Sequence, residues 1–440
     1  MTKERIVILG AAGKDFHVFN CVYRENPDVE VVAFTGTQIM GITGRTYPPI
    51  LAGKLYPNGI PILEEKDLPN IIKKYNVDTC IFAYSDIKHV DVMHLCSIAN
   101  TNGADFTLLS MDKTMLKSSK PVISINAVRT GVGKSQTSRY VTNVLKELGF
   151  KVAAMRHPMP YGDLSKQVAQ RFAAYEDLDK YETTIEEREE YEPYIDRGFV
   201  IFAGVDYQKI LDMAEKEADV IIWDGGNNDT PFVKPDLHIC LADPHRPGHE
   251  LTYHPGETNF RAANVILINK VDSAKPESVE SIIANAKAVN PSATIIKAAS
   301  PQFVENPDEV KGKKVLVIED GPTITHGSLS TGAGMLAATK FGAGGIADPK
   351  PYVVGTIKDA FNKYKQLDMA LPALGYSEQQ LSELEQVIEK VPCDAVLSGT
   401  PIDITRVIKV SKPIIRVRYE LEELDGTPLK DLITKTVKKS

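Results

Sequence analysis

The stretch PVISINAVRTGVGKSQTSRYVTNVLKELGFKVAAMRH, residues 121–157, predicts how the chain is organised. It opens with an apolar, β-branched run, which is typical of a buried strand. A glycine-rich turn follows, and apolar residues then recur at helical spacing from Val141 to Leu148. A strand, a glycine-rich loop and a helix that begins with Lys134 and Ser135 are together typical of a phosphate-binding loop.

Each part of this loop has a chemical role in holding a nucleoside triphosphate. Gly131 and Gly133 let backbone N–H groups turn inward around phosphate oxygens, and the helix N-terminus adds partial positive charge. Lys134 neutralises the β- and γ-phosphates, and the Ser135 hydroxyl binds Mg²⁺. Val128 stands where the strict GxxxxGK[ST] pattern has glycine, so the loop resembles the variant loop of the dethiobiotin synthetase, MinD and signal-recognition GTPase class. The expected nucleotide-binding residues of the loop are Arg129, Thr130, Gly131, Val132, Gly133, Lys134, Ser135 and Gln136.

Two motifs further along the chain support a nucleotide site. VIIWDGGNND is an apolar strand that ends in Asp224, whose carboxylate can hold Mg²⁺ opposite Ser135. VILINKVD places Asn269, Lys270 and Asp272 directly after another apolar strand. In this pattern the aspartate accepts from guanine N–H groups and the lysine packs over the ring. The motif therefore predicts a purine pocket and favours GTP.

Polar side chains also follow the strand at 152–155, in the segment MRHPMPYGDL. Arg156 and His157 suit an anionic substrate, Tyr161 is a further candidate for substrate contact, and Asp163 suits a metal ion. In an open parallel sheet, ligands bind beyond the carboxyl ends of the strands, so we expect these side chains to face the crevice that holds the triphosphate. The alternative is a loop made rigid by its prolines.

The segment DPHRPGHELTYHPGE follows another apolar strand and is dense in histidine. A metal site is one interpretation, because His245 and His249 are four residues apart, but Pro247 argues against the helix that would align them. We favour an anion clamp, in which Arg246 contacts a phosphate through two nitrogens. His245, His249 and His254 then supply further donors or a proton relay. A loop without chemical function is the third interpretation.

One more strand end, EDGPTITHG, carries acids. Glu319 is a candidate for a second Mg²⁺ or for accepting a proton, and His326 is a candidate for contact with a substrate phosphate; a structural turn is the alternative. The acidic stretch at 176–192 is expected to be a solvated helical insertion. The expected metal-binding residues are therefore Ser135, Asp163, Asp224 and Glu319.

Composition places the chain among ordinary globular proteins, with 43% hydrophobic and 25% charged residues. The net charge of −7 and a pI near 5.8 give no reason to expect nucleic acid or an anionic membrane as a partner. The five cysteines form no CxxC pair and suit reduced thiols, and no apolar run is long enough to span a membrane. We therefore expect a cytoplasmic protein that holds its anionic substrate by local charges.

The 440 residues predict two or three domains. The strand at 5–10 ends in GAAG before a helix and a second strand, which is typical of a Rossmann-like unit, but the spacing is not GxGxxG. We therefore expect a structural or substrate-side role there rather than NAD binding. The predicted α/β chain has a Rossmann-like domain at 1–118, a P-loop NTPase domain of the dethiobiotin synthetase/MinD type with a mostly parallel sheet at 119–350, and an α/β extension at 351–440 that completes the P-loop domain.

The N-terminal unit and the strings RTGVGKS, MRHPMPYGDL, WDGGNND, DPHRPGHE, NKVD and EDGPTITHG together resemble the cyclic 2,3-diphosphoglycerate synthetase family over most of the chain. The resemblance implies that ATP drives closure of 2,3-diphosphoglycerate into a ring with an internal phosphoanhydride. It also implies Mg²⁺, K⁺ and a homodimer. The family includes members described only as predicted GTPases, so it supports the reaction class more firmly than the substrate.

The function predicted from the sequence is phosphoryl transfer from ATP or GTP to a small anionic, phosphorylated acceptor. Lys134 and Asp224 act at the triphosphate, and Arg156, His245 and Arg246 are expected to stabilise the transferred group. Two alternatives stay open: a GTPase switch or metallochaperone-like NTPase, and a ligase that activates another anionic small molecule. The cations at the strand ends count against the switch, which does not need them.

Overall fold

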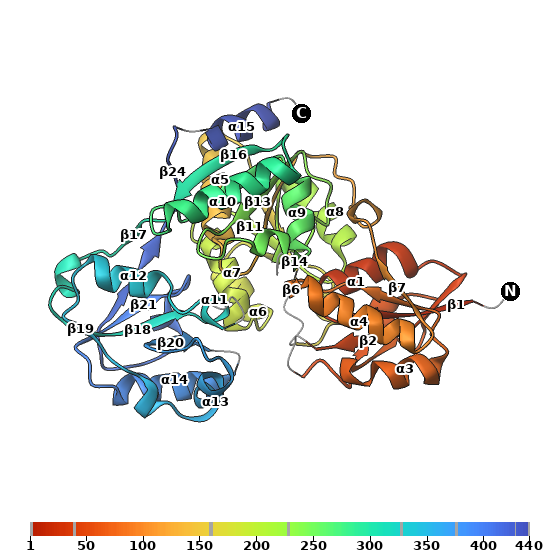
Figure 1. Cartoon of the computed structure of the whole chain (residues 1–440), viewed down its shortest axis with the longest axis horizontal. Coiled ribbons are helices and arrows are strands. Elements are labelled where there is room, and N and C mark those ends of the chain that lie inside the picture. The colour runs from red at the N-terminus through yellow and green to blue at the C-terminus, as the bar shows by residue number, and fades with distance from the viewer. Residues whose placement is uncertain are drawn as a thin grey trace.

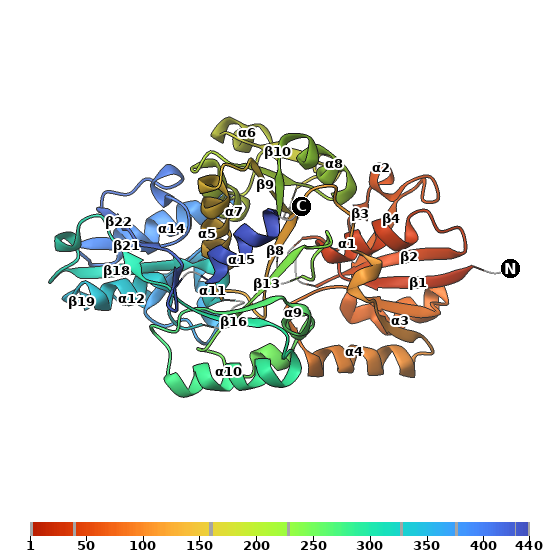
Figure 2. The same ribbon diagram turned by 90° about the horizontal axis from the view of Figure 1, so that it is seen from above.

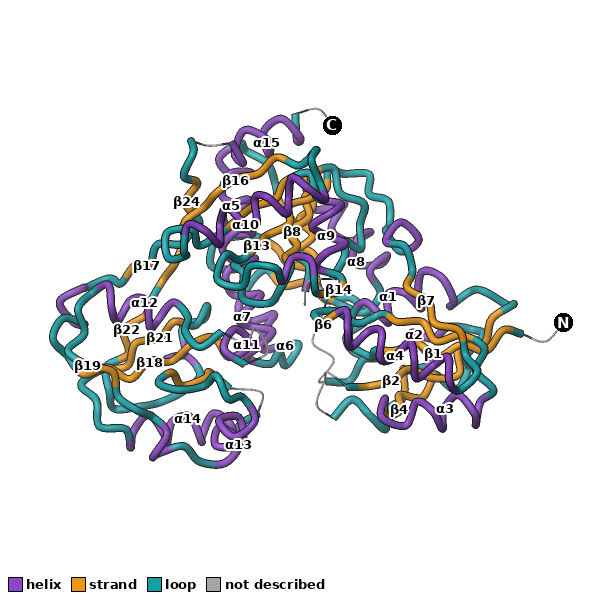
Figure 3. Tube along the Cα trace, viewed as in Figure 1, coloured by secondary structure: helices purple, strands orange, loops and turns teal. Residues whose placement is uncertain are grey.

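The computed structural model describes residues 3–37, 41–157, 162–226, 229–325, 329–374, 377–426 and 428–438. It divides the chain among three mixed α/β lobes, each built on its own mostly parallel sheet. Figures 1 and 2 show the central lobe between the N-terminal lobe, in red and orange, and the third lobe, in cyan and blue. Figure 3 shows helices flanking the strands of every lobe.

The N-terminal lobe is a six-stranded sheet in the order β3-β4-β2-β1-β5-β7, in which only β3 is antiparallel. Its apolar strand β1 is buried from Ile6 to Leu9 because helices cover both faces of the sheet. The elements are β1 (Glu4–Leu9), α1 (Lys14–Val18), β2 (Val29–Gly36), β3 (Thr46–Tyr47), α2 (Pro49–Ala52), β4 (Ile60–Glu64), α3 (Leu68–Tyr75), β5 (Thr79–Phe82), β6 (Ile87–Lys88), α4 (His89–Thr101) and β7 (Asp105–Leu108).

The central lobe is a nine-stranded sheet in the order β10-β11-β9-β12-β8-β13-β15-β16-β24. Every strand from β11 to β16 runs parallel to its neighbours, and only the edge strands β10 and β24 are antiparallel. The elements are β8 (Val122–Ala127), α5 (Lys134–Glu147), β9 (Val152–Arg156), β10 (Gln170–Phe172), α6 (Tyr175–Lys180), α7 (Ile185–Ile195), β11 (Val200–Ala203), α8 (Tyr207–Glu217), β12 (Val220–Asp224), β13 (Leu237–Ala242), β14 (Tyr253–His254), α9 (Gly256–Ala262), β15 (Val265–Ile268), α10 (Pro276–Val289), β16 (Thr294–Ala299), β24 (Glu422–Glu423) and α15 (Pro428–Val437).

The third lobe is a five-stranded parallel sheet in which β18 pairs with β19, β20 and β21, and β22 extends it. The short strands β17 and β23 form an antiparallel pair where the chain enters and leaves this lobe. The elements are β17 (Gln302–Phe303), β18 (Lys314–Asp320), α11 (Gly321–Ile324), α12 (Ala333–Lys340), β19 (Gly345–Ile346), α13 (Gly355–Lys363), β20 (Ala370–Ala373), α14 (Glu378–Lys390), β21 (Ala395–Gly399), β22 (Ile414–Arg416) and β23 (Arg418–Tyr419).

The sheets divide the C-terminal half differently from the boundaries expected from the sequence. The segment at 314–416 builds a sheet of its own, so the expected extension at 351–440 is not one unit that completes the P-loop domain. Only β24 and α15 return to the central lobe, where Leu429 and Ile433 join its apolar core. The apolar pattern identifies strands but does not say which sheet each one joins, which is why the boundary near 350 was wrong.

The single tryptophan, Trp223, makes the central core measurable. Trp223 is fully buried and its ring lies 4.4 Å from that of Phe232, so its emission reports unfolding of the central lobe. Ile266→Ala empties a fully buried position in β15 and should lower the free energy of unfolding by about 2 to 5 kcal/mol. Chemical denaturation followed by tryptophan fluorescence measures this change.

The matched control for that substitution is Leu424→Ala, since Leu424 lies next to β24 with 46% of its surface exposed. It should change the unfolding free energy by no more than about 0.5 kcal/mol. Equal losses in both variants would contradict the assignment of the core to the central sheet.

Candidate functional site

The phosphate-binding loop lies between β8 and α5, at the carboxyl edge of the central sheet. Gly131 and Gly133 have positive φ angles of 80° and 113°, which residues with a side chain rarely adopt. A Cβ at Gly133 would also overlap the side-chain amide of Asn269. The two glycines therefore allow the turn that directs the chain into α5 at Lys134.

Three carbonyl groups of the loop are held by side chains from neighbouring strand ends. The Arg246 guanidinium donates to the Thr130 carbonyl at 2.8 Å. Asn269 Nδ2 donates to the Val132 carbonyl at 2.8 Å, and Lys270 Nζ donates to the Gly131 carbonyl at 2.6 Å. Because each carbonyl is fixed, the loop is held in one shape before any ligand binds.

Arg246 consequently does not have the role that the sequence predicted for it. Its Nε and Nη2 atoms donate to Asp243 Oδ2 at 2.9 and 2.7 Å, in addition to the loop contact. Burial alone would raise the pKa of Asp243, but Lys270 and Arg246 hold it below its usual value. The guanidinium is already bound within the protein and braces the loop, so it is not an open clamp for an anion.

The N-terminal lobe also reaches the loop, through Asp86. One carboxylate oxygen of Asp86 accepts from Arg129 Nε at 2.6 Å, and the other accepts from the Thr130 hydroxyl at 2.6 Å. Arg129 additionally bonds to His249 Nδ1 at 2.8 Å and lies 3.7 Å from the centre of the Tyr253 ring. Asp86 could not be predicted from the sequence, because nothing in its own segment marks it as a partner of the loop.

A buried ionic network lies beside Lys134. Arg156 pairs with Glu190 at 2.7 Å and with Asp224 at 3.1 Å, and Tyr194 donates to Asp224 Oδ2 at 2.8 Å. Burial lowers the pKa of Lys134, the nearby Arg156 lowers it further, and the acids oppose this shift. Burial raises the pKa of Glu190, with Arg156 opposing. The network brings together Lys134, Arg156 and Asp224, which the sequence predicted to act together.

Glu190 belongs to α7, in the stretch at 176–192 that the sequence predicted to be solvated, and Tyr194 follows in the same helix. Glu187, Glu189 and Glu192 of this helix are buried. The prediction was wrong because a run of acids usually marks a solvent-facing helix, whereas α7 packs against α5 and places its acids beside the loop.

The site also fits a magnesium ion. Asp224 Oδ1 is buried and has no hydrogen-bond partner among the described residues, although Oδ2 has two. Ser135 opens α5 and is only partly buried, so its hydroxyl is accessible to a ligand. A carboxylate and a hydroxyl are ligands that Mg²⁺ prefers in proteins. Ser135 and Asp224 would therefore hold the ion.

The other two predicted metal ligands lie elsewhere. Asp163 is exposed, and its Oδ1 accepts from the backbone and hydroxyl of Ser165. Glu319 is buried in the third lobe and accepts from the N–H groups of Gly332, Gly334 and Met335. Burial raises the pKa of Glu319 to about 7 even though these bonds oppose the shift. Across the residues that the structure describes, no group of three or more His, Cys, Asp or Glu side chains could hold a metal.

The predicted histidines do not form one cluster. His245 is exposed and bonds to the Ser273 hydroxyl at 3.0 Å, and the His249 ring contacts Arg129. His254 lies in β14, which pairs with β6 of the N-terminal lobe, and burial lowers its pKa to about 4. Tyr161 and His326, also predicted to bind substrate, lie outside the described residues.

His157 lies where the N-terminal and central lobes meet. A Cβ on Gly13 would come within 3.2 Å of His157 Cγ, and a Cβ on Gly226 would overlap the ring. Both glycines therefore leave room for the buried imidazole. The GAAG turn after β1 thus packs against His157.

Further charged residues lie near the loop: Lys14 and Asp229, which the sequence did not single out, and Asp320, which it offered beside Glu319 as a candidate for Mg²⁺ or a proton. Burial raises the pKa of Asp229 to about 6, with Lys14 opposing, and burial lowers the pKa of Lys14 to about 8. From the third lobe, Asp320 accepts from the Thr323 N–H at 3.2 Å, and Lys270 and Lys134 oppose the rise that burial causes in its pKa. Only the three-dimensional structure brings these acids to the loop.

Of the NKVD motif, Asp272 is the residue that does not touch the loop directly. Its Oδ1 accepts from the Ser300 N–H at 3.1 Å, and the Ser300 hydroxyl donates to Gln136 Oε1 at 2.9 Å. Asp272 is exposed, next to the bracing pair Asn269 and Lys270.

No protein-family model matches the chain. The chain is 61% identical over 436 residues to the arginine synthetase ArcE of Thermococcus kodakarensis, covering 99% of this chain and 97% of that protein. It is 27% identical over 268 residues to the cyclic 2,3-diphosphoglycerate synthetase of Thermococcus sibiricus, covering 56% of this chain and 59% of that protein.

Solved structures resemble the chain only loosely. LpxK from Aquifex aeolicus in complex with ATP is 13% identical with a TM-score of 0.45, covering 84% of this chain and 99% of that one. The cobyrinic acid a,c-diamide synthase of Mycobacterium smegmatis, with a bound ATP analogue and magnesium, is 17% identical with a TM-score of 0.18, covering 40% and 71%. At these scores the likeness assigns neither a ligand nor an activity.

Both curated relatives are synthetases, and the loop geometry is that of a nucleotide site, so the chain is an NTP-dependent synthetase. The resemblance to cyclic 2,3-diphosphoglycerate synthetases holds at this level, since that relative matches little more than half of the chain. Within the described residues, no helix is long and apolar enough to cross a membrane. Identity of 61% over nearly the whole of both proteins means that the chain belongs to the arginine synthetase ArcE family.

Proposed function

We propose that this protein is an NTP-dependent arginine synthetase. The proposal is supported by 61% identity over 97% of the length of the arginine synthetase ArcE. It is also supported by the ion pairs that the arginines around the loop form with carboxylates, since a highly anionic acceptor would need unpaired arginines.

The charge balance of the site is the observation that carries this proposal. Arg129 pairs with Asp86 at 2.6 Å, and Arg246 pairs with Asp243 at 2.7 Å. Arg156 has two carboxylates within 3.1 Å. An acceptor with several phosphates would need free cations beside the triphosphate, whereas these guanidinium groups are already neutralised. A zwitterionic or cationic amino acid does not require them.

The chemistry of the product indicates the reaction. A guanidinium group differs from a ureido group in carrying nitrogen where the ureido group has its carbonyl oxygen. That oxygen leaves only after activation, and transfer of the γ-phosphoryl group to it supplies the activation and releases the nucleoside diphosphate. Ammonia then adds to the same carbon, inorganic phosphate leaves and a proton is released. The acceptor is accordingly a ureido amino acid, citrulline, and the product is arginine.

Each residue at the phosphate loop has its own role in this reaction. Lys134 and the loop amides bind the β- and γ-phosphates. Ser135 with Asp224 would hold Mg²⁺, which would supply further positive charge beside the phosphates. Arg156 pairs with Asp224 at 3.1 Å and so orients its carboxylate. Glu190 pairs with Arg156 at 2.7 Å and so fixes the guanidinium group that contacts Asp224.

The base of the nucleotide is left to experiment. Asn269 and Lys270 brace the loop, and Asp272 lies next to them, as expected for a purine pocket. The NKVD sequence favours GTP, and the resemblance to the diphosphoglycerate enzymes favours ATP. K⁺, a homodimer and a cytoplasmic location likewise stay predictions.

Closure of 2,3-diphosphoglycerate is the second candidate, favoured by the partial match to the enzyme from Thermococcus sibiricus. It needs the same loop, metal and γ-phosphoryl transfer, but the acceptor is a phosphate rather than a ureido oxygen. A GTPase switch or metallochaperone-like NTPase, and a ligase for another small anion, differ from both in their products.

The reaction products distinguish the proposed arginine synthetase from the other candidates. Purified protein with Mg²⁺, ammonium, citrulline and either ATP or GTP should form arginine and inorganic phosphate in equal amounts, measured by mass spectrometry and a phosphate assay. Lys134→Ala should reduce the rate by about 100-fold or more, because the transferred phosphoryl group loses its cation.

A parallel reaction with 2,3-diphosphoglycerate, followed by ³¹P NMR, tests the second candidate. A cyclic phosphoanhydride signal without any arginine would replace the proposed function by ring closure. Nucleotide hydrolysis that does not depend on either acceptor would exclude both and favour a switch.

Substitution of Asp224 and Asp163, both predicted from the sequence to bind the metal, should have different effects on the rate. Asp224→Asn should reduce the rate by about 100-fold and raise the Mg²⁺ concentration needed for half-maximal rate, since a buried ligand loses its charge. Asp163→Asn should change both quantities by no more than about twofold, because Asp163 is exposed and bonded to Ser165. Magnesium titrations of the two variants make the comparison, and equal losses would contradict the metal site described above.

A further inference from the structure

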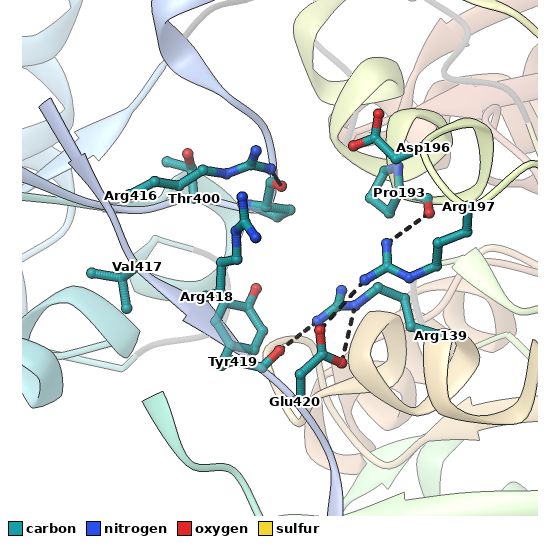
Figure 4. A pocket seen from close by; sticks show the side chains of 11 residues that line it. Arg139, Pro193, Asp196, Arg197, Thr400, Arg416, Val417, Arg418, Tyr419 and Glu420 are labelled. Atoms are coloured by element: carbon teal, nitrogen blue, oxygen red, sulfur yellow. Dashed lines mark hydrogen bonds and ion pairs between the residues drawn. The ribbon is translucent and has the colours of Figure 1, made fainter. Parts of the chain in front are cut away.

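A separate pocket lies where the third lobe joins the central lobe, and none of the P-loop residues at 129–136 lines it. Its volume is about 380 Å³. Figure 4 shows Arg139 and Arg197 on one side of this pocket and Arg416 and Arg418 on the other. We call it the joint pocket.

On the central side, the joint pocket is built around one acid and two arginines. Arg139 of α5 donates to the Tyr419 carbonyl at 2.8 Å and lies 3.8 Å from Glu420. Arg197, in the turn after α7, donates to the Pro193 carbonyl at 2.9 Å and lies 3.4 Å from the same Glu420. Only 8% of the Arg139 side chain is exposed, so its charge is fixed inside the protein.

On the side of the third lobe, Arg416 adds a further positive charge. It donates to the Pro401 carbonyl at 2.8 Å, and no carboxylate of the described residues lies within ion-pair distance of it. Asp196, the other acid of the pocket, already accepts from the Tyr175 hydroxyl. The joint pocket thus holds more guanidinium charge than carboxylate charge.

The electrostatic effect of this excess is visible at Arg197. Burial lowers the pKa of Arg197, and the neighbouring Arg139 and Arg416 lower it further, with Glu420 opposing. The guanidinium-bearing residues Arg139, Arg197 and Arg416 all line this one pocket. A planar guanidinium presents five N–H donors in a fork that matches tetrahedral oxyanions, and few of these donors are used within the protein.

We propose that the joint pocket binds a phosphoryl anion, held by Arg139 and Arg197 of the central lobe and by Arg416 of the third lobe. Three arginines that line one pocket call for a ligand with more than one negative charge and several acceptor oxygens, which a phosphoryl group has. Such a ligand ties the two lobes together. The third lobe also carries Thr323, whose Cγ2 would lie 3.3 Å from a Cβ on Gly131, so its position bears on the P-loop.

Calorimetric titration of the full chain, saturated with Mg-ADP and at constant ionic strength, tests this proposal. Inorganic phosphate and phenyl phosphate are the two probes. Arg197→Gln and Arg416→Gln should each weaken binding by about tenfold or more, because a charge-assisted hydrogen bond is lost. The matched control is Arg171→Gln, a surface arginine paired with Glu217, which should change the affinity by no more than about twofold.

A variant with the opposite expected effect guards against misfolding. Glu420→Gln removes the internal acid and should tighten phosphate binding, which a folding defect cannot do. In the unaltered protein, phosphate should slow hydrogen exchange at 193–197 and 414–420. Equal affinity for both probes would show that the pocket can bind the phosphoryl group of a larger molecule. Binding of inorganic phosphate but not of phenyl phosphate would show that the ligand is the free ion.

Three results would overturn the proposal. The first is that neither probe binds in the presence of Mg-ADP. The second is that binding disappears in Lys134→Ala but persists in Arg197→Gln and Arg416→Gln, which would place the anion in the P-loop. The third is that Arg171→Gln weakens binding as much as the pocket variants do.

Discussion

The phosphate loop can have its shape only if its carbonyl groups are bound elsewhere. A tight turn of this kind exposes backbone groups on both of its faces, and each buried carbonyl left without a donor costs about 1 to 3 kcal/mol. Arg246, which follows β13, and the adjacent residues Asn269 and Lys270, which follow β15, supply the donors. The nucleotide site therefore exists before the nucleotide arrives, and the strands that carry these residues have to keep their order for the loop to persist.

Parallel strands explain why so many segments can reach one loop. Residues that follow parallel strands all emerge at the same edge of the sheet, and β8, β9, β12, β13 and β15 are close neighbours in the central sheet. The other two lobes add the ends of their own strands. The N-terminal lobe brings Asp86 to the loop, and the third lobe brings Thr323 close to Gly131. Residues of all three lobes therefore lie at the loop.

The sequence predicted the site residues that lie at strand ends. It did not predict which arginines form ion pairs with which carboxylates. Apolar runs marked the strands, so Lys134, Asp224 and Asn269 could be placed at one edge from the sequence alone. Arg246 was read as a clamp because its partner, Asp243, three residues earlier, is invisible as a partner until the turn is seen. Asp86 and Glu190 come from segments without any motif, and only folding shows that they neutralise Arg129 and Arg156.

The phosphate loop and the joint pocket differ in how many of their arginines are paired with carboxylates, and this difference favours different ligands. Around the P-loop, buried arginines face carboxylates at 2.6 to 3.1 Å, so their charge is compensated inside the protein and serves to hold the loop and Asp224 in place. At the joint pocket, Glu420 alone stands between Arg139 and Arg197, and Arg416 has no described carboxylate within ion-pair distance. A guanidinium group without a counterion is costly to keep partly buried. The first arrangement suits an uncharged or cationic acceptor, whereas the second is stabilised when an anion binds between the lobes.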